Sequence, residues 1–182
     1  MKSMEDLSLH ILDIAENAIN AGAKNVTIFI RRKTETDLLT IEIADDGEGM
    51  SAEAAEKVSD PFYTTRTTRR VGLGLPLLKA ATEATGGHLE IRSAPGIGTR
   101  VIATFAMSHI DRKPLGDLAA TIVMLVAGNP DVHFSYHWEH DGGKFSFSTR
   151  ELREKYPALD LNAPEALSFI RAYLTDHSPS VS

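Results

Sequence analysis

Hydrophobic residues recur along residues 5–21 at the spacing of an α-helix. The apolar positions form one broad face, which consists of Leu7, Ile11, Ile14, Ala15, Ala18 and Ile19. A polar stripe lies beside this face at steps of three and four, and it consists of His10, Asp13, Asn17 and Asn20. Gly22 follows, and glycine readily ends a helix in the left-handed conformation. The pattern predicts an amphipathic helix whose polar stripe is either a solvated surface or a binding face.

Alternating apolar and polar residues predict strands further along the chain. Val26, Ile28 and Ile30 share one side of a strand over residues 25–33. Further strands are expected at residues 38–45, 88–93 and 99–106. Helices are expected at residues 52–58 and 75–85.

The pattern changes after residue 108. Residues 109–116 are predicted to be a linker, and an apolar helix over 117–127 ends at Gly128-Asn129-Pro130. A hairpin is predicted from strands 132–139 and 144–148, followed by two helices. Its aromatic residues are expected on two different faces: Phe134, Tyr136 and Trp138 on one, Phe145 and Phe147 on the other. We therefore divide the chain into a domain over 1–108, a linker over 109–116 and a small α-β-β-α unit over 117–182.

Composition narrows the class of protein. The net charge is −6, which gives no support to nucleic-acid binding through phosphate neutralisation. The chain has no cysteine, which excludes disulfides, zinc–thiolate sites and iron–sulfur clusters. The apolar run from Thr121 to Ala127 is too short to span a bilayer, and the N-terminus lacks the apolar core of a signal peptide. A cytoplasmic protein without membrane or nucleic-acid partners is expected.

Candidate chemistry begins at Asp45-Asp46-Gly47-Glu48-Gly49-Met50, directly after a predicted strand. Gly47 and Gly49 permit a tight turn and close approach of backbone to a flat ligand. Asp45 can accept a hydrogen bond from an exocyclic amine, which suits adenine, although a plain turn has the same composition. On the first helix, the amide of Asn17 suits Mg²⁺. Asp13, one turn earlier, could orient or deprotonate a nucleophile.

A second glycine-rich stretch, Val71-Gly72-Leu73-Gly74-Leu75-Pro76, precedes a predicted helix. Free N–H groups and the positive end of a helix dipole would make it an anion site. Residues 64–70 have no apolar periodicity and predict a loop before it. The histidines His133, His137 and His140 are a weaker candidate for a metal site, because no carboxylate pattern completes the set.

Five motifs, in this order, resemble the GHKL ATPase superfamily, and most closely its histidine kinase-like type. The resemblance covers residues 5–107. Residues 13–23 resemble the N-box, with Asn17 at its Mg²⁺-binding position, and residues 45–49 resemble the box whose aspartate binds adenine. Pro61-Phe62-Tyr63-Thr64-Thr65 resembles the F-box of histidine kinases. Gly72-Leu73-Gly74-Leu75 resembles the second glycine box, and Gly96-Ile97-Gly98-Thr99 the closing G-x-G-T motif.

The resemblance implies an α/β two-layer sandwich, in which a mixed sheet has helices on one face and ATP lies beneath a lid. The implied cofactors are ATP and Mg²⁺. The implied nucleotide contacts are Asn17, Asp45, Gly47, Gly49, Pro61, Phe62, Thr64, Thr65, Gly72, Leu73, Gly74, Leu75 and Thr99. Asp13 stands where the family usually has a glutamate base, and Arg70 where it usually has a further glycine.

Two functions follow from the resemblance. No phosphoacceptor domain precedes the first helix in this sequence, and His10 lies inside that helix. The first hypothesis is therefore a two-component-type signalling kinase that phosphorylates a partner protein in trans. The alternative is a nucleotide-gated protein-binding module, or an anti-sigma-type regulator, with little turnover. Residues 117–182 would serve partner docking or lid control, and homodimerisation is left open.

Overall fold

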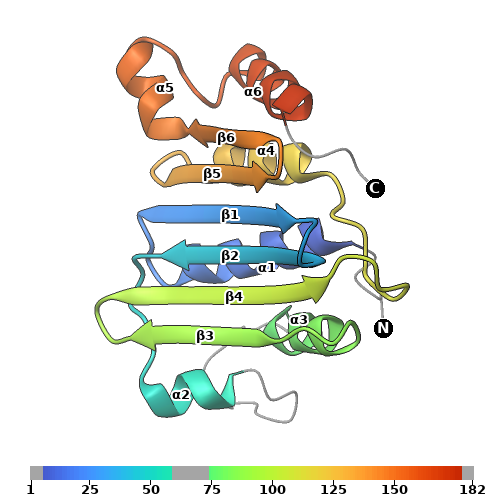
Figure 1. Cartoon of the computed structure of the whole chain (residues 1–182). Coiled ribbons are helices and arrows are strands. Elements are labelled where there is room, and N and C mark those ends of the chain that lie inside the picture. The colour runs from blue at the N-terminus through green and yellow to red at the C-terminus, as the bar shows by residue number, and fades with distance from the viewer. Residues whose placement is uncertain (1–5, 59–73, 178–182) are drawn as a thin grey trace.

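One six-stranded mixed sheet carries the described part of the chain, which comprises residues 6–58 and 74–177 of this computed structural model. The strands are β1 (Asn25–Lys33), β2 (Leu38–Asp45), β3 (Leu89–Ala94), β4 (Gly98–Ala106), β5 (His133–His140) and β6 (Gly143–Ser148). Their spatial order is β3-β4-β2-β1-β5-β6 (Figure 1). All neighbours pair antiparallel except β1 and β5, which are parallel.

The helices of the described residues are α1 (Leu7–Asn20), α2 (Ala52–Lys57), α3 (Gly74–Glu83), α4 (Leu118–Gly128), α5 (Thr149–Lys155) and α6 (Pro164–His177). α1, α3 and α4 lie behind the sheet in Figure 1, and α6 packs against α4. The predicted mixed sheet with helices on one face is thus confirmed. Each predicted strand appears within one or two residues of its expected bounds.

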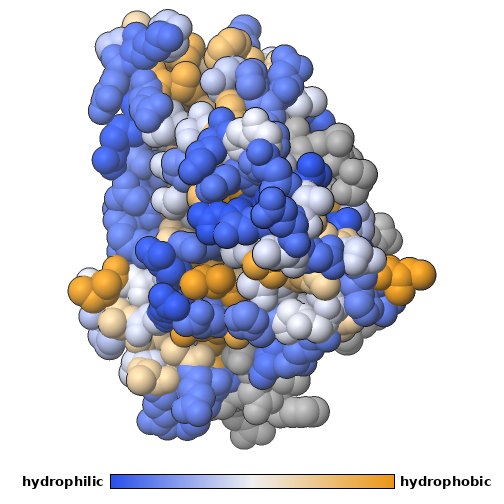
Figure 2. Space-filling view, viewed as in Figure 1, coloured by the Kyte–Doolittle hydropathy of each residue, from blue (hydrophilic) through white to orange (hydrophobic). Residues whose placement is uncertain are grey.

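The sheet is buried on its helix side only. Along β1, for example, Val26, Ile28 and Ile30 are buried, while the residues between them are partly exposed. The open side is largely hydrophilic (Figure 2) and carries cross-strand ion pairs such as Arg100 with Glu42 at 2.9 Å. A one-sided antiparallel sheet gives this alternation, which is why sequence periodicity located the strands.

The C-terminal elements extend the same sheet. β5 pairs with β1 from Asn25↔His133 to Arg31↔Glu139. The core likewise runs from one half of the chain to the other, because Tyr136 and Leu174 belong to the same buried cluster as Leu7. The predicted helix, hairpin and helices after residue 117 are all present. The division into residues 1–108, 109–116 and 117–182 stays a prediction, and the shared sheet and core show how closely these parts are joined.

The segment predicted as a linker packs on the start of α1. Leu7 N donates a hydrogen bond to the Pro114 carbonyl at 2.9 Å, and Leu115 is buried. Gly116 adopts a positive φ of 78° and lies against Asp6 and Ser8. Residues 114–116 therefore hold the first turn of α1.

One expectation about the hairpin is wrong. Tyr136 lies opposite Phe147, and Trp138 lies opposite Phe145, in the β5–β6 register. Opposed residues of an antiparallel pair point to the same side of the sheet, so the five aromatic residues share one face rather than two. Phe134, Tyr136, Trp138 and Phe147 are buried there against the helices.

Within residues 6–58 and 74–177, no cluster of three or more His, Cys, Asp or Glu side chains is arranged to hold a metal ion. No helix within those ranges combines the length and apolar character needed to cross a membrane.

The shared core predicts that residues 117–177 unfold together with the rest of the chain. Ile170→Ala removes a fully buried side chain of α6 and should cost about 2–5 kcal/mol of unfolding free energy. Calorimetry should show one transition at lower temperature, and amide exchange should accelerate in β2 as well as in β5. Phe169→Ala, at a position that is 56% exposed, is the control and should have a small effect. A separate early transition with β2 unaffected would contradict a shared core.

Candidate functional site

The polar stripe of α1 meets the start of α3. Asp13 and Asn17 lie one helical turn apart and are both half-buried. A Cβ built on Gly74, the first residue of α3, would overlap Oδ2 of Asp13. Only glycine therefore lets α3 begin this close to the Asp13 carboxylate.

Burial raises the pKa of Asp13 above its ordinary value. Among the described residues, no group donates a hydrogen bond to its buried Oδ2. A carboxylate that lacks a donor and has a raised pKa is suited to accept a proton from a ligand or a nucleophile.

Asp45 ends β2 with its carboxylate half-buried. Gly47 N donates a hydrogen bond to Asp45 Oδ1 at 2.8 Å. Burial raises the pKa of Asp45, and the backbone N–H groups of Gly47 and Thr99 oppose this rise. A partly desolvated carboxylate gains from a further donor, and the exocyclic amine of adenine would supply one.

Two glycines allow the loop after β2 and the turn before β4 to touch through their backbones. A Cβ at Gly49 would overlap the Ala94 carbonyl, and a Cβ at Gly98 would overlap the Asp45 carbonyl. Both glycines have positive φ, of 67° and 118°. These two glycines therefore serve loop–loop packing, and for Gly49 this adds to the ligand approach expected from the sequence.

Side-chain hydroxyls join the same two loops. Ser93 Oγ accepts a hydrogen bond from Met50 N at 2.8 Å and lies 2.9 Å from the Gly98 carbonyl oxygen, to which it donates. Thr99, which faces Asp45 across the β2–β4 ladder, shares a 2.8 Å hydrogen bond with Ser93 Oγ. Thr99 was predicted from its motif, whereas Ser93 gave no signal in the sequence.

Asp46 joins the end of β2 to the start of β1. It was not predicted as a site residue from the sequence. Its Oδ1 accepts hydrogen bonds from Lys24 N and Asn25 N, both at 2.8 Å, and its Oδ2 accepts one from Asn25 Nδ2 at 2.6 Å. Burial alone would raise the pKa of Asp46, but these hydrogen bonds outweigh burial and lower it. The signal in the sequence that could have identified Asp46 is a second acidic residue directly after Asp45.

The predicted residues that are described fall into two groups along α1. Asp13 and Gly74 form the first group, and Asp45, Gly47 and Thr99 form the second. Ala21, just after α1, links the helix to the second group, because its carbonyl accepts Glu48 N at 2.9 Å. Asn17 lies on α1 between the two groups.

The remaining predicted residues differ in status. Leu75 is 7% exposed and packs in the core, where it holds α3 in place. Six predicted contacts lie outside the described residues, namely Pro61, Phe62, Thr64, Thr65, Gly72 and Leu73.

His10, the first member of the polar stripe, is buried rather than solvated, with 1% of its surface exposed. Neither ring nitrogen has a hydrogen-bond partner of good geometry among the described residues. Burial and the Lys113 charge lower the pKa of His10 to about 4, while Asp6 and the Gly74 backbone oppose the shift.

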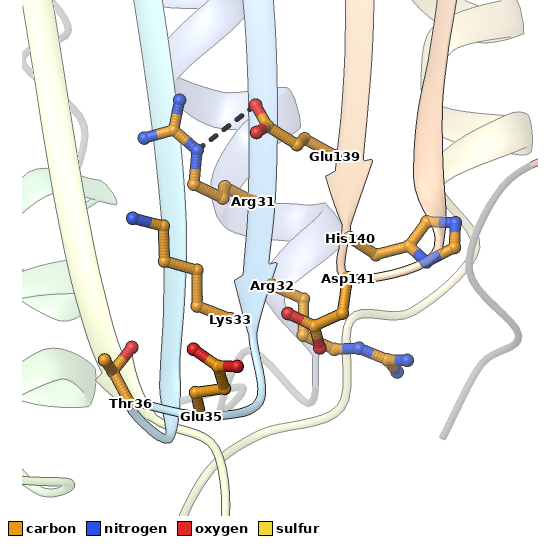
Figure 3. A pocket seen from close by; sticks show the side chains of 8 residues that line it. All are labelled: Arg31, Arg32, Lys33, Glu35, Thr36, Glu139, His140 and Asp141. Carbon is orange, nitrogen blue, oxygen red and sulfur yellow. Dashed lines mark hydrogen bonds and ion pairs between the residues drawn. The ribbon is translucent and has the colours of Figure 1, made fainter.

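Two surface hollows lie away from the predicted site residues. One, of about 280 Å³, lies between the β1–β2 turn and the end of β5. It is lined by both cationic and anionic side chains (Figure 3). There Arg31 forms an ion pair with Glu139 at 3.3 Å, so part of the positive charge that lines this hollow is already neutralised. The other, of about 370 Å³, lies between α1 and α4 and is lined by Leu12 and Met124 among others.

Comparison with known proteins gives the family of this chain. The model of the histidine kinase-, DNA gyrase B- and HSP90-like ATPases matches residues 4–109, more than half of the chain. The chain belongs to this ATPase family. Residues 4–109 are thus a histidine kinase-like ATP-binding domain, and the family generally binds ATP with Mg²⁺.

Several relatives are bacterial sensor proteins. The sensor protein kinase FleS of Pseudomonas aeruginosa is 36% identical over 105 residues, which are 58% of this chain and 25% of that protein. The non-motile and phage-resistance protein of Caulobacter vibrioides is 34% identical over 119 residues, which are 60% of this chain and 14% of that protein. The chain thus matches a quarter or less of the length of these relatives.

A solved structure supports the fold of this ATPase-family chain. The N-terminal domain of a DNA repair protein superposes with a TM-score of 0.56 at 16% identity. The superposition covers 81% of this chain and 53% of that one, so it extends beyond the segment that the family model matches.

The described residues fit ATP and Mg²⁺ on their own chemistry. Asp45 offers a half-buried acceptor suited to the adenine amine. Asn17 offers a neutral oxygen on the same helix as Asp13, and Asp13 Oδ2 lacks a donor among the described residues. Hard oxygen ligands of this type suit Mg²⁺ together with phosphate.

The contact between the two glycine loops can be tested with a matched pair of glycines. Gly49 and Gly96 have similar positive φ values, 67° and 74°, but only at Gly49 would a Cβ meet other atoms. Both Gly→Ala variants carry backbone strain of about 1–3 kcal/mol. Gly49→Ala should lose more unfolding free energy than Gly96→Ala, and it should bind nucleotide more weakly because the loop that follows Asp45 is displaced. Equal losses in urea denaturation would contradict the packing role.

The burial of His10 predicts a loss of stability in acid. The unfolded chain takes up a proton near pH 6.5, whereas the folded chain does so only near pH 4. The corresponding stability is therefore present above pH 6.5 and is lost as the pH falls towards 4, by about 3 kcal/mol. His10→Leu should remove most of this dependence in urea denaturation between pH 7 and 4.5, whereas His109→Gln, on the surface, should keep it. Parallel stability curves for the wild type and His10→Leu would refute the assignment.

Proposed function

We propose that this chain is a cytoplasmic ATP- and Mg²⁺-binding kinase that phosphorylates a separate partner protein in signal transduction. The observation that carries the proposal is the half-buried Asp45 carboxylate, held by Gly47 and placed by two interlocking glycine loops. The sensor-kinase names of several relatives support the reaction class, although only a part of each relative is matched.

Each residue has a role in this proposal. Asp45 accepts a hydrogen bond from the adenine amine, and Asn17 holds Mg²⁺, which neutralises charge on the phosphate oxygens. The bond between the γ-phosphorus and the ADP oxygen breaks, and a bond to a nitrogen or oxygen of the partner's acceptor side chain forms. Asp13 takes up the proton that the acceptor loses, and its raised pKa suits that task.

A second function is favoured by the residue at position 13. An aspartate is one methylene shorter than the glutamate base to which the resemblance pointed, and its carboxylate packs against the start of α3. A short, held carboxylate favours a nucleotide-gated binding module or an anti-sigma-type regulator with slow turnover. Both functions require the same nucleotide site, so one experiment addresses them together.

We predict that Asn17→Ala weakens binding of Mg·ATP at least tenfold but changes binding of metal-free ATP, measured in EDTA, much less. The reason is that Asn17 acts on the nucleotide through the metal, and a lost interaction with a charged group costs about 1.5–3 kcal/mol. Titration calorimetry measures both constants. Asn20→Ala, at an exposed position one turn further along α1, is the control and should bind like the wild type.

Incubation with γ-labelled ATP then separates the two functions. Label that reaches an added acceptor protein and depends on Asn17 supports the kinase. Tight Mg·ATP binding, with no label transferred and no phosphate released, supports the gated module. Failure of the wild-type chain to bind ATP would overturn both.

A further inference from the structure

A line of side-chain hydrogen bonds connects α5 to the adenine end of the site. Arg150 Nη2 donates to Asn25 Oδ1 at 2.7 Å. Asn25 Nδ2 donates to Asp46 Oδ2 at 2.6 Å. Asp46 directly follows Asp45, so three residues from three separate segments lead to the carboxylate proposed to bind adenine.

The starting point of this line is firmly placed. Thr149, the first residue of α5, is buried and accepts a hydrogen bond from Phe134 N of β5 at 3.0 Å. β5 in turn pairs with β1 in the register Asn25↔His133. Arg150 is therefore held beside Asn25 by the sheet itself.

Arg150 and Asp46 together fix which way the Asn25 amide faces. A guanidinium has donors only, so it must meet the amide oxygen, and this turns the amide nitrogen towards Asp46. Asp46 accepts only and favours the same orientation, so without Arg150 the Asn25 amide keeps one of these two partners and is held less firmly. The arginine thus sets a donor in place for Asp46 without touching Asp46.

Asp46 in turn restrains the backbone next to Asp45. Besides the Asn25 side chain, Asp46 binds the backbone N–H groups of Lys24 and Asn25, which joins the end of β2 to the start of β1. Asp46 directly follows the last residue of β2, so these hydrogen bonds fix the backbone on the C-terminal side of Asp45.

The position of Arg150 within α5 is unfavourable for the helix itself. It lies in the first turn, where a cation opposes the helix dipole. The second arginine of α5, Arg153, donates instead to the Pro130 carbonyl and is not part of the line. A surface role would be equally served by a neutral residue at position 150, whereas the contact with Asn25 Oδ1 requires a donor.

We propose that Arg150 is a positioning residue for adenine selectivity, acting through Asn25 and Asp46 on Asp45. The inference rests on the proposed nucleotide binding and adds to it a role for the C-terminal unit. It makes the preference of the site for an adenine base depend on a helix that lies outside the segment matched by the family model.

The test compares ATP with inosine triphosphate, whose base has a carbonyl in place of the exocyclic amine. Dissociation constants for both are measured by calorimetry for the full chain and for Arg150→Met, Arg153→Met and Asp45→Asn. Arg150→Met should reduce the preference for ATP by about threefold to tenfold, the size expected for one hydrogen bond, with less change in affinity for inosine triphosphate. Arg153→Met should keep the wild-type preference, and Arg150→Lys should restore part of it.

The outcomes distinguish the two levels of inference. Asp45→Asn should lose the preference completely, and a wild-type preference in that variant would overturn the proposed adenine contact. If Asp45→Asn loses the preference but Arg150→Met keeps it, the positioning role alone is refuted. Equal weakening of both nucleotides by Arg150→Met, together with a lower melting temperature, would assign Arg150 a structural role and also refute the proposal.

Discussion

The proposed nucleotide end of the molecule depends on direct contact between two backbone segments. The loop after β2 and the turn before β4 touch at Gly49 against Ala94 and at Gly98 against Asp45, where no side chain could be accommodated. Asp45 is therefore positioned by a turn about fifty residues further along the chain as well as by its own strand. Gly49 and Gly98 are required by this packing, because each supplies space and a positive φ at the same residue.

Sheet topology explains how the C-terminal elements reach that same end. β1 and β2 are antiparallel, so β2 ends, at Asp45, where β1 begins. β5 is parallel to β1 and begins at this end, and β6 returns antiparallel and finishes there at Ser148. α5 follows directly, so its first turn lies beside Asn25. Because β5 runs parallel to β1 and β6 returns to the same end, α5 lies next to the loop after β2 without any long connection.

Local pattern predicted the elements and the main motifs well, because both are set within short stretches of sequence. The periodicity of α1 and the acidic glycine loop after β2 belong to this class. Alternation along a strand indicates which side is buried, but it does not say which strand lies next to it. The pairing of β5 with β1 was therefore beyond prediction, and so was the shared face of Phe145 and Tyr136.

Long-range contacts account for the site residues that were missed. His10 belongs to the polar stripe by period, yet it is buried, and its electrostatic surroundings include Lys113 and Gly74 from distant segments. Ser93 and Asn25 are ordinary strand residues until the fold brings them to the loop at residues 45–50. The predicted contacts within residues 59–73 lie outside the described part of the chain and stay predictions.

Packing around Asp13 gives a physical reason for the aspartate at that position. The start of α3 lies so close to its carboxylate that Gly74 has no room for a Cβ. A glutamate at position 13 would extend one methylene further and would have to displace α3 or turn away from it. Asp13 and Gly74 are thus matched to each other, and a longer acid would require a different placement of the helix that follows the second glycine box. This approach of α3 links the proposed proton acceptor to the end of the chain's second glycine motif.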